Sequence, residues 1–361
     1  MNSQHIAVDL AKNVFQIAEC NSAGKVIARK RFNRSEFRRY LTLECAPATV
    51  IMEACGTANY WGRLAQTAGH QVILLHARYV KPYRHRNKTD RNDCNAILDA
   101  AHAVDLKPVP VKSVLQQQIQ QLHRLRELWK HNRTQRINML RGILREHGVE
   151  AAERTEPFLR ECATLIENDA LKPLAAQLHI LLAEIQHHSE WMQACEAQLK
   201  QLLRQDDIVQ RIDEISGIGL LTASALVAAV GTPERFKNGR MLSAWLGMTP
   251  KEYSSGQSRK LGHISREGDS YLRTLLIHGA RAALLAAKRC AARTPDKLTR
   301  LQQWAIQLCV RIGHNRTAVA LANKMVRISW AVWKHARRFD GNFMPTMALP
   351  KSVNQEKILA S

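Results

Sequence analysis

Four carboxylates are the residues of this sequence whose spacing points most directly to chemistry. Asp9 and Glu53 each end a short apolar run that reads as a β-strand. If the two strands are neighbours, both side chains emerge at one edge of a sheet. Asp90 and Asp93 follow a basic loop and open a predicted helix, where the i to i+3 spacing places them on one helical face. The pattern predicts that these four acidic groups converge at one sheet edge.

A divalent cation is the expected partner of such a cluster. Four neighbouring carboxylates repel one another unless a cation neutralises them, and oxygen ligands favour Mg²⁺ or Mn²⁺. Two such ions about 3.5–4 Å apart stabilise both the attacking and the leaving oxygen in phosphoryl transfer. Taken singly, the acids have simpler explanations: Asp90 and Asp93 suit the first turn of a helix, and Asp9 could cap a turn. The four together, in this order, favour a metal site.

A serine is the second candidate reactive group. Ser255 lies in the loop Tyr253-Ser254-Ser255-Gly256, between basic helical segments. A hydroxyl in a glycine-flanked loop can reach a phosphodiester, but it needs activation by a metal, a base or an arginine. Arg259 and Lys260 could stabilise the developing charge. A Ser-Ser-Gly stretch is more often a plain surface turn, and Ser254 competes with Ser255 for the same role.

The net charge points to a polyanionic partner. The 361 residues include 53 Lys and Arg against 31 Asp and Glu, a formal net charge of +22. A membrane surface is the rival interpretation, but the sequence has no uncharged apolar run of about 18 residues and no signal peptide. None of the eight cysteines forms a C-x-x-C pair, so we expect reduced thiols in a cytoplasmic protein.

Three basic runs could follow a nucleic-acid backbone. They cover residues 25–39, 78–91 and 124–145, and the second leads directly to Asp90. Charge runs are usually solvated faces, yet three of them fit a phosphate track better. Gly217 and Gly219 flank a turn before an apolar helix, as in a helix-hairpin-helix, where main-chain N–H groups approach a phosphate. An ordinary helix–helix turn explains these two glycines equally well.

Alternating strand and helix signals organise the first part of the chain. The predicted strands are 5–9, 14–19, 26–32, 49–53 and 71–75, and the predicted helices are 35–43, with Ser35 as N-cap, 58–68 and 89–103. This order resembles that of ribonuclease H, and an α/β sandwich is expected.

Long helices dominate the rest of the sequence. Two helical stretches cover about 113–147 and 174–206. The second has a heptad seam, which is formed by Leu181, Ile185, His188, Met192, Cys195, Leu199 and Leu202. The first is a weaker coiled coil or a helix that gives one face to nucleic acid, and simple helical packing remains an alternative for both. Residues 208–338 read as mostly helical.

The motifs in this order resemble those of the DEDD-type insertion-sequence transposases, serine-dependent recombinases related to certain DNA invertases. The resemblance spans nearly the whole chain. Its motifs are Val8-Asp9-Leu10-Ala11-Lys12, Met52-Glu53-Ala54-Cys55-Gly56, Asn87-Lys88-Thr89-Asp90-Arg91-Asn92-Asp93, Gly217-Ile218-Gly219, Ala244-Trp245-Leu246-Gly247-Met248-Thr249-Pro250, Tyr253-Ser254-Ser255-Gly256, Gly268-Asp269-Ser270-Tyr271-Leu272-Arg273 and Ala318-Val319-Ala320-Leu321-Ala322-Asn323-Lys324.

The resemblance implies a role for each matching residue. Asp9, Glu53, Asp90 and Asp93 would form the DEDD tetrad of a RuvC-like, ribonuclease-H-like domain, and Ser255, directly before the motif glycine, would be the nucleophile. Cys94 stands where the family pattern leads us to expect a small residue such as alanine. The residues predicted to contact nucleic acid are Arg86, Lys88, Arg91, Gly217, Gly219, Arg259, Lys260 and Arg273.

Pattern and resemblance together predict the domain organisation. A RuvC-like metal-binding catalytic domain covers 1–110, a helical coiled-coil oligomerisation region 111–207, a mostly α-helical transposase domain with the serine 208–340, and a poorly ordered tail 341–361. The family forms tetramers, dimers of dimers, whose active sites combine acids and serine from different protomers. It binds donor and target double-stranded DNA with a bridge RNA that selects sequence by base pairing. The implied location is the bacterial cytoplasm, in association with the nucleoid.

Three functions follow from these predictions. The first is a transposase that cuts and rejoins DNA through a covalent serine–DNA link at a Mg²⁺-bound DEDD site. The second is a RuvC-like nuclease or junction resolvase in which water attacks and Ser255 is a bystander. The third is a non-catalytic basic scaffold for nucleic acid.

Overall fold

A computed structural model describes residues 5–21, 24–84, 90–103, 108–256 and 258–343, and of residues 90 and 91 the backbone alone. The predicted tail at 341–361 therefore lies outside the described residues from 344 onward. The chain divides into two compact units, Met1–Gln118 and Ile119–Ser361. Within the described residues, no helix is both long and apolar enough to span a lipid bilayer.

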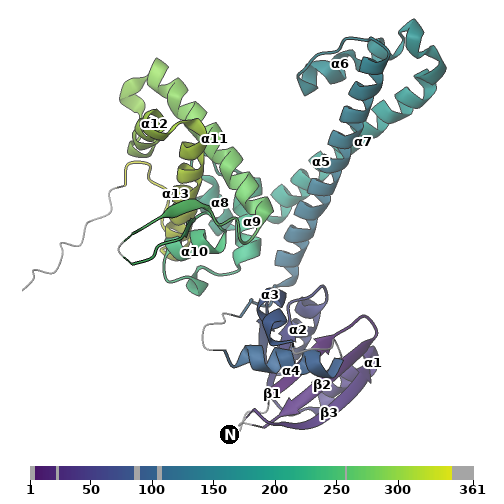
Figure 1. Cartoon of the computed structure of the whole chain (residues 1–361), viewed down its shortest axis with the longest axis vertical. Helices are drawn as coiled ribbons and strands as arrows, with labels where there is room; N and C mark the ends of the chain where they lie inside the picture. Colours follow the sequence, from purple (N-terminus) through teal and green to yellow (C-terminus); the bar gives the residue numbers. More distant parts are fainter. Residues whose placement is uncertain (1–4, 22–23, 85–89, 104–107, 257, 344–361) are drawn as a thin grey trace, which may run out of the picture. The chain divides into compact units, whose positions relative to one another are not determined.

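The N-terminal unit is built on a five-stranded sheet with the order β3-β2-β1-β4-β5 (Figure 1). Neighbouring strands among the first three pair antiparallel, and β4 and β5 extend the sheet with parallel pairing. The strands are β1 His5–Leu10, β2 Val14–Cys20, β3 Val26–Asn33, β4 Thr49–Glu53 and β5 Gln71–Leu75. All five lie where the hydrophobic runs predicted them, and the mixed α/β class of this unit is confirmed.

Helices pack on both faces of this sheet because successive strand residues point to opposite sides. Ile6 and Val8 belong to a core shared with Phe37 and Trp61, whereas Ala7 belongs to a core shared with Ile97. The helices are α1 Arg34–Arg39, a π-helical turn Tyr40–Glu44, α2 Ala58–Thr67, α3 Ala77–Val80, a 3-10 turn Lys81–Tyr83 and α4 Asp90–Ala101. Thus α1 and α2 cover one face of the sheet, and α4 covers the other.

The predicted N-cap of α1 was wrong by two residues. Asn33 caps the helix: its side chain accepts hydrogen bonds from the N–H groups of Ser35 and Glu36. The Glu36 carboxylate in turn accepts the Asn33 N–H at 2.8 Å, which completes a capping box. Ser35 instead lies inside the first turn, where its hydroxyl donates to Asn33.

The second unit, as far as the structure describes it, is helical except for one hairpin. Its elements are α5 Val114–Glu146, which starts before the unit boundary, α6 Thr155–Ile166, a 3-10 turn Asp169–Leu174, α7 Ala175–Leu202, α8 Asp207–Asp213, α9 Leu220–Val230, a 3-10 turn Pro233–Arg235, α10 Gly239–Trp245, β6 Pro250–Glu252, β7 Leu261–Ile264, α11 Ser270–Arg293, a 3-10 turn Pro295–Lys297, α12 Arg300–Ile312 and α13 His314–Lys334. The predicted helical character is confirmed, and the hairpin β6–β7 was not predicted.

Helices α5 and α7 lie antiparallel, and ion pairs join them from Arg126 to Glu196 and from Arg136 to Glu184 (Figure 1). The buried seam of α7 consists of Leu178, Leu182, Ile185, His188, Cys195 and Leu199. Of the six seam positions predicted from Ile185 onward, four are buried: Ile185, His188, Cys195 and Leu199. Before them, Leu182 is buried in place of the predicted Leu181. His188 is buried against the ring of Trp129, with centroids 5.7 Å apart.

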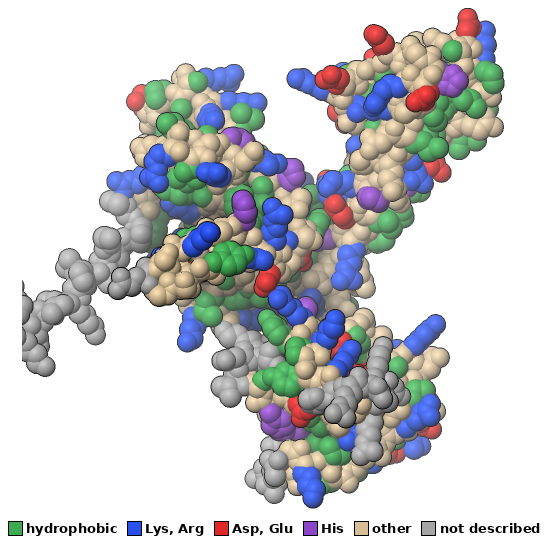
Figure 2. Space-filling view, viewed as in Figure 1, with side chains coloured by type: hydrophobic (Ala, Val, Ile, Leu, Met, Phe, Trp, Pro, Cys, Tyr) green, Lys and Arg blue, Asp and Glu red, His purple; other side chains and the backbone are tan. Residues whose placement is uncertain are grey.

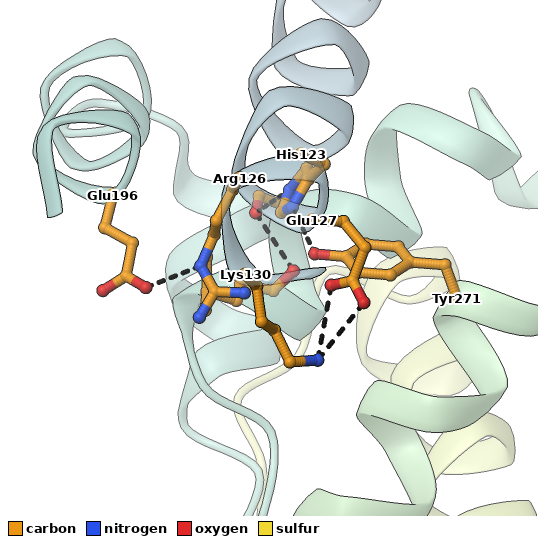
Figure 3. A network of polar contacts seen from close by, with 8 residues as sticks. His123, Arg126, Glu127, Lys130, Glu196 and Tyr271 are labelled. Carbon is orange, nitrogen blue, oxygen red and sulfur yellow. Dashed lines mark hydrogen bonds and ion pairs between the residues drawn. The ribbon is translucent and has the colours of Figure 1, made fainter. Parts of the chain in front are cut away.

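A buried histidine joins α5 to α9 and α11 (Figure 3). The His123 ring lies 3.0 Å from the Tyr271 hydroxyl and 3.0 Å from Ser224 Oγ. Since the single hydroxyl proton of Ser224 goes to the Leu220 carbonyl at 2.6 Å, Nε2 must be the donor to Ser224, and Nδ1 accepts from Tyr271. Both contacts therefore suit neutral imidazole. Burial, with Arg126 nearby, lowers the pKa of His123 to about 4.

Two close main-chain contacts between glycines and neighbouring segments fix the second unit. A Cβ on Gly217 would lie 2.6 Å from the Gly279 carbonyl oxygen of α11, and a Cβ on Gly279 would lie 1.9 Å from the Gly217 oxygen. Likewise, a Cβ on Gly247 would lie 1.9 Å from the Glu267 oxygen, and one on Gly268 would lie 2.2 Å from the Trp245 oxygen. The second contact forms the base of the hairpin β6–β7, because Arg266 N–H also donates to the Gly247 carbonyl.

We expect Gly247→Ala to destabilise the second unit more than Gly148→Ala does. Both glycines have φ +69°, a left-handed conformation that costs a side chain about 1–2 kcal/mol. Only Gly247 adds a collision with main chain, since no atom of the described residues lies within 4 Å of a Cβ on Gly148. Urea unfolding of the two variants measures the difference, and equal losses would show that the loops at Gly247 move apart freely.

The buried His123 predicts a loss of stability in acid. The pKa is about 4 in the folded chain, against about 6.5 in the unfolded chain, so the unfolded state binds the proton more readily between these values. The neutral His123 therefore contributes about 3 kcal/mol to the free energy of unfolding. This contribution is complete above pH 6.5 and is lost as the pH falls toward 4. Unfolding of His123→Gln should depend less on pH over this window. His131→Gln, an exposed control on the same helix, should behave as the wild type, and identical curves for all three proteins would contradict the assignment.

Candidate functional site

The sheet places Asp9 and Glu53 on the same face and at the same end. β1 and β4 run parallel with Val8 opposite Met52, so the next residue of each strand is Asp9 and Glu53. Both continue the alternation of Ala7 and Ile51, which pack in the core under α4. The two strands therefore direct these carboxylates to the side of the sheet that α4 covers.

Helix α4 brings Asp93 to this edge, and Arg84 joins it to Glu53. Arg84 Nη2 donates to Glu53 Oε2 at 2.9 Å, and Arg84 Nε lies 3.1 Å from Asp93 Oδ1. One guanidinium thus balances two carboxylates from different elements. Sequence reasoning placed Arg84 only within a basic run and missed this role, because nothing in the spacing shows which cation of the run faces the acids.

Asp9, Glu53 and Asp93 mark one edge of the sheet, which we call the acidic edge, and one carboxylate oxygen there has no hydrogen bond to a described residue. Asp93 is 7% exposed, and its Oδ1 has no hydrogen-bond partner among the described residues, because the contact with Arg84 has ion-pair distance but not hydrogen-bond geometry. A buried unsatisfied carboxylate oxygen fits a hard cation. Among the described residues, however, no three His, Cys, Asp or Glu side chains are close enough to hold a metal ion. The Asp90 side chain lies outside the described residues.

Cys94 is a buried neutral thiol beside the acids. Burial raises its pKa to about 12, and the charges of Asp9 and Asp93 act in the same direction. Its Sγ donates to the Gln16 carbonyl at 3.4 Å. Cysteine is near in size to the small residue expected at this position, and it is buried there.

The predicted nucleophile lies at the exposed tip of the hairpin β6–β7. Ser255 and Ser258 exchange two main-chain hydrogen bonds of 3.1 Å, and Gly256 between them has φ +55°. Ser255 is exposed, and its hydroxyl makes no hydrogen bond to another described residue. The tip therefore presents this hydroxyl to solvent, where a substrate can reach it.

Ser254 differs from Ser255 in having a carboxylate partner. Its hydroxyl donates to Glu252 Oε1 at 2.7 Å, and Arg259 Nε donates to the same oxygen at 3.1 Å. The hydrogen bond from Ser254, with help from Arg259, lowers the pKa of Glu252. An ionised Glu252 holds the hydroxyl of Ser254 and the guanidinium of Arg259 in place, while Lys260 is exposed beside them.

Arg273 clamps the base of the hairpin. Its Nη1 donates to the carbonyls of Leu246, Glu267 and Gly268 at 3.1–3.2 Å, so its described contacts are with main chain rather than an open surface. A contact of Arg273 with nucleic acid stays a prediction. The clamp was missed in the sequence, where an arginine beside a glycine-rich turn looks the same as a phosphate ligand.

The two glycines of the turn before α9 have different roles: Gly217 allows close packing, and Gly219 starts the helix. Gly217 has φ +88° and lies against the main chain of α11 at Gly279. Gly219 is the N-cap of α9, and in the described part of the chain only Asp213 Oδ1, at 3.9 Å, lies within 4 Å of the place of a Cβ. The space at Gly219 leaves room for an approaching phosphate, whereas the side of Gly217 that faces α11 has none.

The basic runs differ in how freely their charges face solvent. Arg126 and Arg136 of the third run form ion pairs across the helices, and the Arg141 guanidinium lies over the Phe158 ring at 4.5 Å. Lys and Arg side chains spread over both units on the face in view (Figure 2). Arg86 and Lys88 lie outside the described residues, as does the side chain of Arg91, so their predicted contacts remain predictions.

Comparison with known proteins shows two matching family models. One, a DEDD transposase model of the IS110 group, matches residues 6–148. The other is described as transposase IS116/IS110/IS902 family and matches residues 209–294. The two models cover the acidic edge and the serine hairpin respectively.

Whole-length relatives agree with these models. A protein of Pseudomonas aeruginosa named "Probable family 20 transposase" is 39% identical over 92% of this chain and 97% of its own length. The transposase for insertion sequence element IS1111A of Coxiella burnetii is 37% identical over 91% of this chain and 88% of its own. The pilin gene-inverting protein of Moraxella bovis is 24% identical over 94% of this chain and 98% of its own. The chain belongs to the IS110/IS116/IS902 family of insertion-sequence transposases, DNA transposases of the DEDD type.

Proposed function

We propose that this transposase cuts and rejoins DNA with two groups of residues, the acidic edge of the N-terminal unit and the serine of the hairpin β6–β7. Asp9, Glu53, Asp90 and Asp93 hold Mg²⁺, with Mn²⁺ as a substitute, in a RuvC-like domain. The unsatisfied Asp93 Oδ1 is the observation that carries the metal assignment. Bound there, the ions supply Lewis-acid stabilisation of phosphate oxygens.

The residues of the chain have separate tasks at the acidic edge. Arg84 neutralises Glu53 and Asp93 when the carboxylates have no other partner. The parallel pair β1–β4 holds Asp9 and Glu53 at one end of the sheet. Cys94 is buried in the core that α4 forms with Ala7 and Ile51.

Ser255 is the nucleophile in this proposal. Its Oγ forms a bond to the scissile phosphorus while its proton passes to a base, and the bond from phosphorus to a deoxyribose oxygen breaks, so that this oxygen leaves as a hydroxyl. The phosphoserine ester keeps the energy of the broken bond, and attack by a strand hydroxyl then rejoins the DNA and releases the serine. Arg259 and Lys260 stabilise the charge that develops on the phosphate.

The exposed tip of the hairpin supports Ser255 over Ser254. The Ser254 hydroxyl is already bonded to Glu252, whereas Ser255 is exposed and its hydroxyl makes no hydrogen bond to a described residue. Of the three functions considered, a hydrolytic nuclease would need neither serine, and a scaffold would need no acids.

Partners and assembly complete the proposal. Donor and target double-stranded DNA bind to basic surfaces, in keeping with the net charge of +22, and a bridge RNA pairs with both to choose the sites. The active form is a tetramer whose sites combine acids and serine from different protomers. The acids lie in the unit that ends at Gln118 and the serine in the unit that begins at Ile119. Residues 111–207 would mediate assembly as a coiled coil, between catalytic domains at 1–110 and 208–340.

Ser255→Ala should abolish both strand cleavage and the covalent protein–DNA adduct, because no other hydroxyl takes over the attack. Ser254→Ala, the matched control, should keep both within a few-fold. Denaturing electrophoresis of labelled DNA with the RNA-loaded protein measures the adduct, and peptide mapping identifies the linked residue. Cleavage that persists in Ser255→Ala without an adduct would establish the hydrolytic nuclease instead.

Mg²⁺ should raise the unfolding temperature of the N-terminal unit, since an ion that binds only the folded state stabilises it by about 2.7 kcal/mol at a hundred times its Kd. Asp93→Asn should lose this shift. Asp99→Asn, an exposed acid on the same helix, should retain it. Thermal unfolding with and without the ion is the measurement, and an equal shift in all three proteins would place the ion elsewhere.

A further inference from the structure

The second unit contains a cavity apart from the acids and the serine. It has a volume of about 870 Å³ and lies between the start of α10, helix α12, the second half of α13 and the segment that follows α13 to Phe343. We call it the α13 pocket. All of its lining belongs to one unit, and neither the proposed chemistry nor the predicted DNA contacts use it.

The α13 pocket is lined by positive charge with little compensation. The described lining holds one carboxylate, Asp340, whose Oδ1 accepts the Asn342 N–H at 2.7 Å. Among the described residues, only one lining cation has an ion-pair partner, Arg338 with Glu214 at 3.9 Å. The lining cations are Arg240, Arg300, Lys324, Arg327, Arg337 and Arg338. Such a cavity attracts an anionic ligand.

Lys324 is the cation set most deeply in this lining. It is half-buried, and its Nζ lies 4.1 Å from the centroid of the Trp304 ring. Burial, followed by the charge of Arg327, lowers its pKa. A lysine held between a ring and a second cation, with no carboxylate partner among the described residues, gains most from a phosphate that neutralises both.

Aromatic residues give the α13 pocket its second property. Trp304 and Trp330 line it, and the Nε1 of Trp330 donates to the Pro233 carbonyl, which fixes that ring. Phe343 lies at its rim with 60% of its surface exposed, so its ring is available for stacking. Phosphate-binding cations beside aromatic rings are the combination that proteins use for unpaired nucleotides.

The volume of the α13 pocket suits a small part of a nucleic acid. An unpaired nucleotide with its phosphate fits within about 870 Å³. A base that is paired inside a duplex is not free to enter the pocket or to stack on a protein ring, whereas a base of a single strand is. The pocket therefore favours a single-stranded segment.

The α13 pocket is also connected to the serine hairpin. Asn323, next to Lys324, donates from Nδ2 to the Met248 carbonyl at 3.0 Å, just before β6 begins. Asn323 and Lys324 both belong to the sequence motif Ala318–Lys324, which has no role in the proposed chemistry. A strand bound to Lys324 would thus lie one residue from the contact that anchors the hairpin.

We propose that the α13 pocket binds an unpaired stretch of nucleic acid, with Lys324 and Arg327 on a phosphate and Phe343 stacked on a base. The site goes beyond the proposed function, since binding here requires neither the acids nor Ser255. RNA and DNA single strands share this chemistry, and separate arms of the test distinguish them.

The test is fluorescence anisotropy with the full chain carrying Ser255→Ala, so that no cleavage occurs. The probes are single-stranded RNA, single-stranded DNA and duplex DNA of about eight nucleotides or base pairs. The double variant Lys324→Gln/Arg327→Gln should bind the preferred single strand at least about tenfold more weakly, and the slope of log K against log salt should become less steep by about 0.7, the value for one lost phosphate contact. The control Lys288→Gln/Arg289→Gln removes the same charge from an exposed part of α11 outside the pocket and should change affinity much less.

Phe343→Ala separates stacking from general attraction. It should weaken single-strand binding about tenfold and leave the salt slope unchanged. If the Lys324 substitution unfolds the protein, Arg327→Gln alone, at an exposed position, tests the same phosphate contact. The stronger of the RNA and DNA arms identifies the source of the strand. Equal losses in the pocket and control variants, or losses for duplex as large as for single strands, would overturn the proposal.

Discussion

The parallel pairing of β1 with β4 is the contact on which the acidic site depends. Because the two strands run in one direction with Val8 opposite Met52, Asp9 and Glu53 leave the sheet at the same end and on the same face. An antiparallel pair would separate them by the length of the strands, and a slip of one residue would turn Glu53 to the face that α1 and α2 cover. α4 then has only to pack on Ala7 and Ile51 to deliver Asp93.

The hairpin that carries Ser255 is positioned in a different way. Its hairpin strands are three and four residues long and have little buried surface, so packing cannot orient them. Main-chain contacts do so instead: Gly247 and Gly268 let two loops touch, and Arg273 ties three carbonyls of those loops together. The base of the hairpin is fixed while its tip, with Ser255, stays exposed. The acids are positioned by a sheet core and the serine by backbone hydrogen bonds.

Elements with strong periodicity were predictable from sequence, and so was the pairing of acids with strand ends. All five strands of the sheet and the long helices follow from hydrophobic runs. The hairpin β6–β7 escaped because Pro250–Glu252 and Leu261–Ile264 are too short and too exposed to alternate. Asn33 could have been chosen over Ser35, since Glu36 stands three residues after Asn33, the spacing of a capping box.

The sequence could not show which of several similar residues makes a given contact. Nothing in the basic run distinguishes Arg84, which lies between Glu53 and Asp93, from its neighbours. Arg273 looks like a phosphate ligand until its three carbonyl partners are seen. Gly217 looks like a place for DNA, yet one side of it is filled by the main chain of α11. Such assignments depend on contacts between residues that are distant in sequence.

The position of β3 at the margin of the sheet has a consequence for how the protein behaves in solution. A border strand has main-chain groups that another molecule could pair with, and proteins often guard such strands with cations. β3 has Arg29, Lys30 and Arg31 in succession, Lys30 tied to Glu19 of β2 and Arg29 to Asn95 of α4. Like charges on two copies that met along this border would repel each other, which opposes aggregation by strand addition.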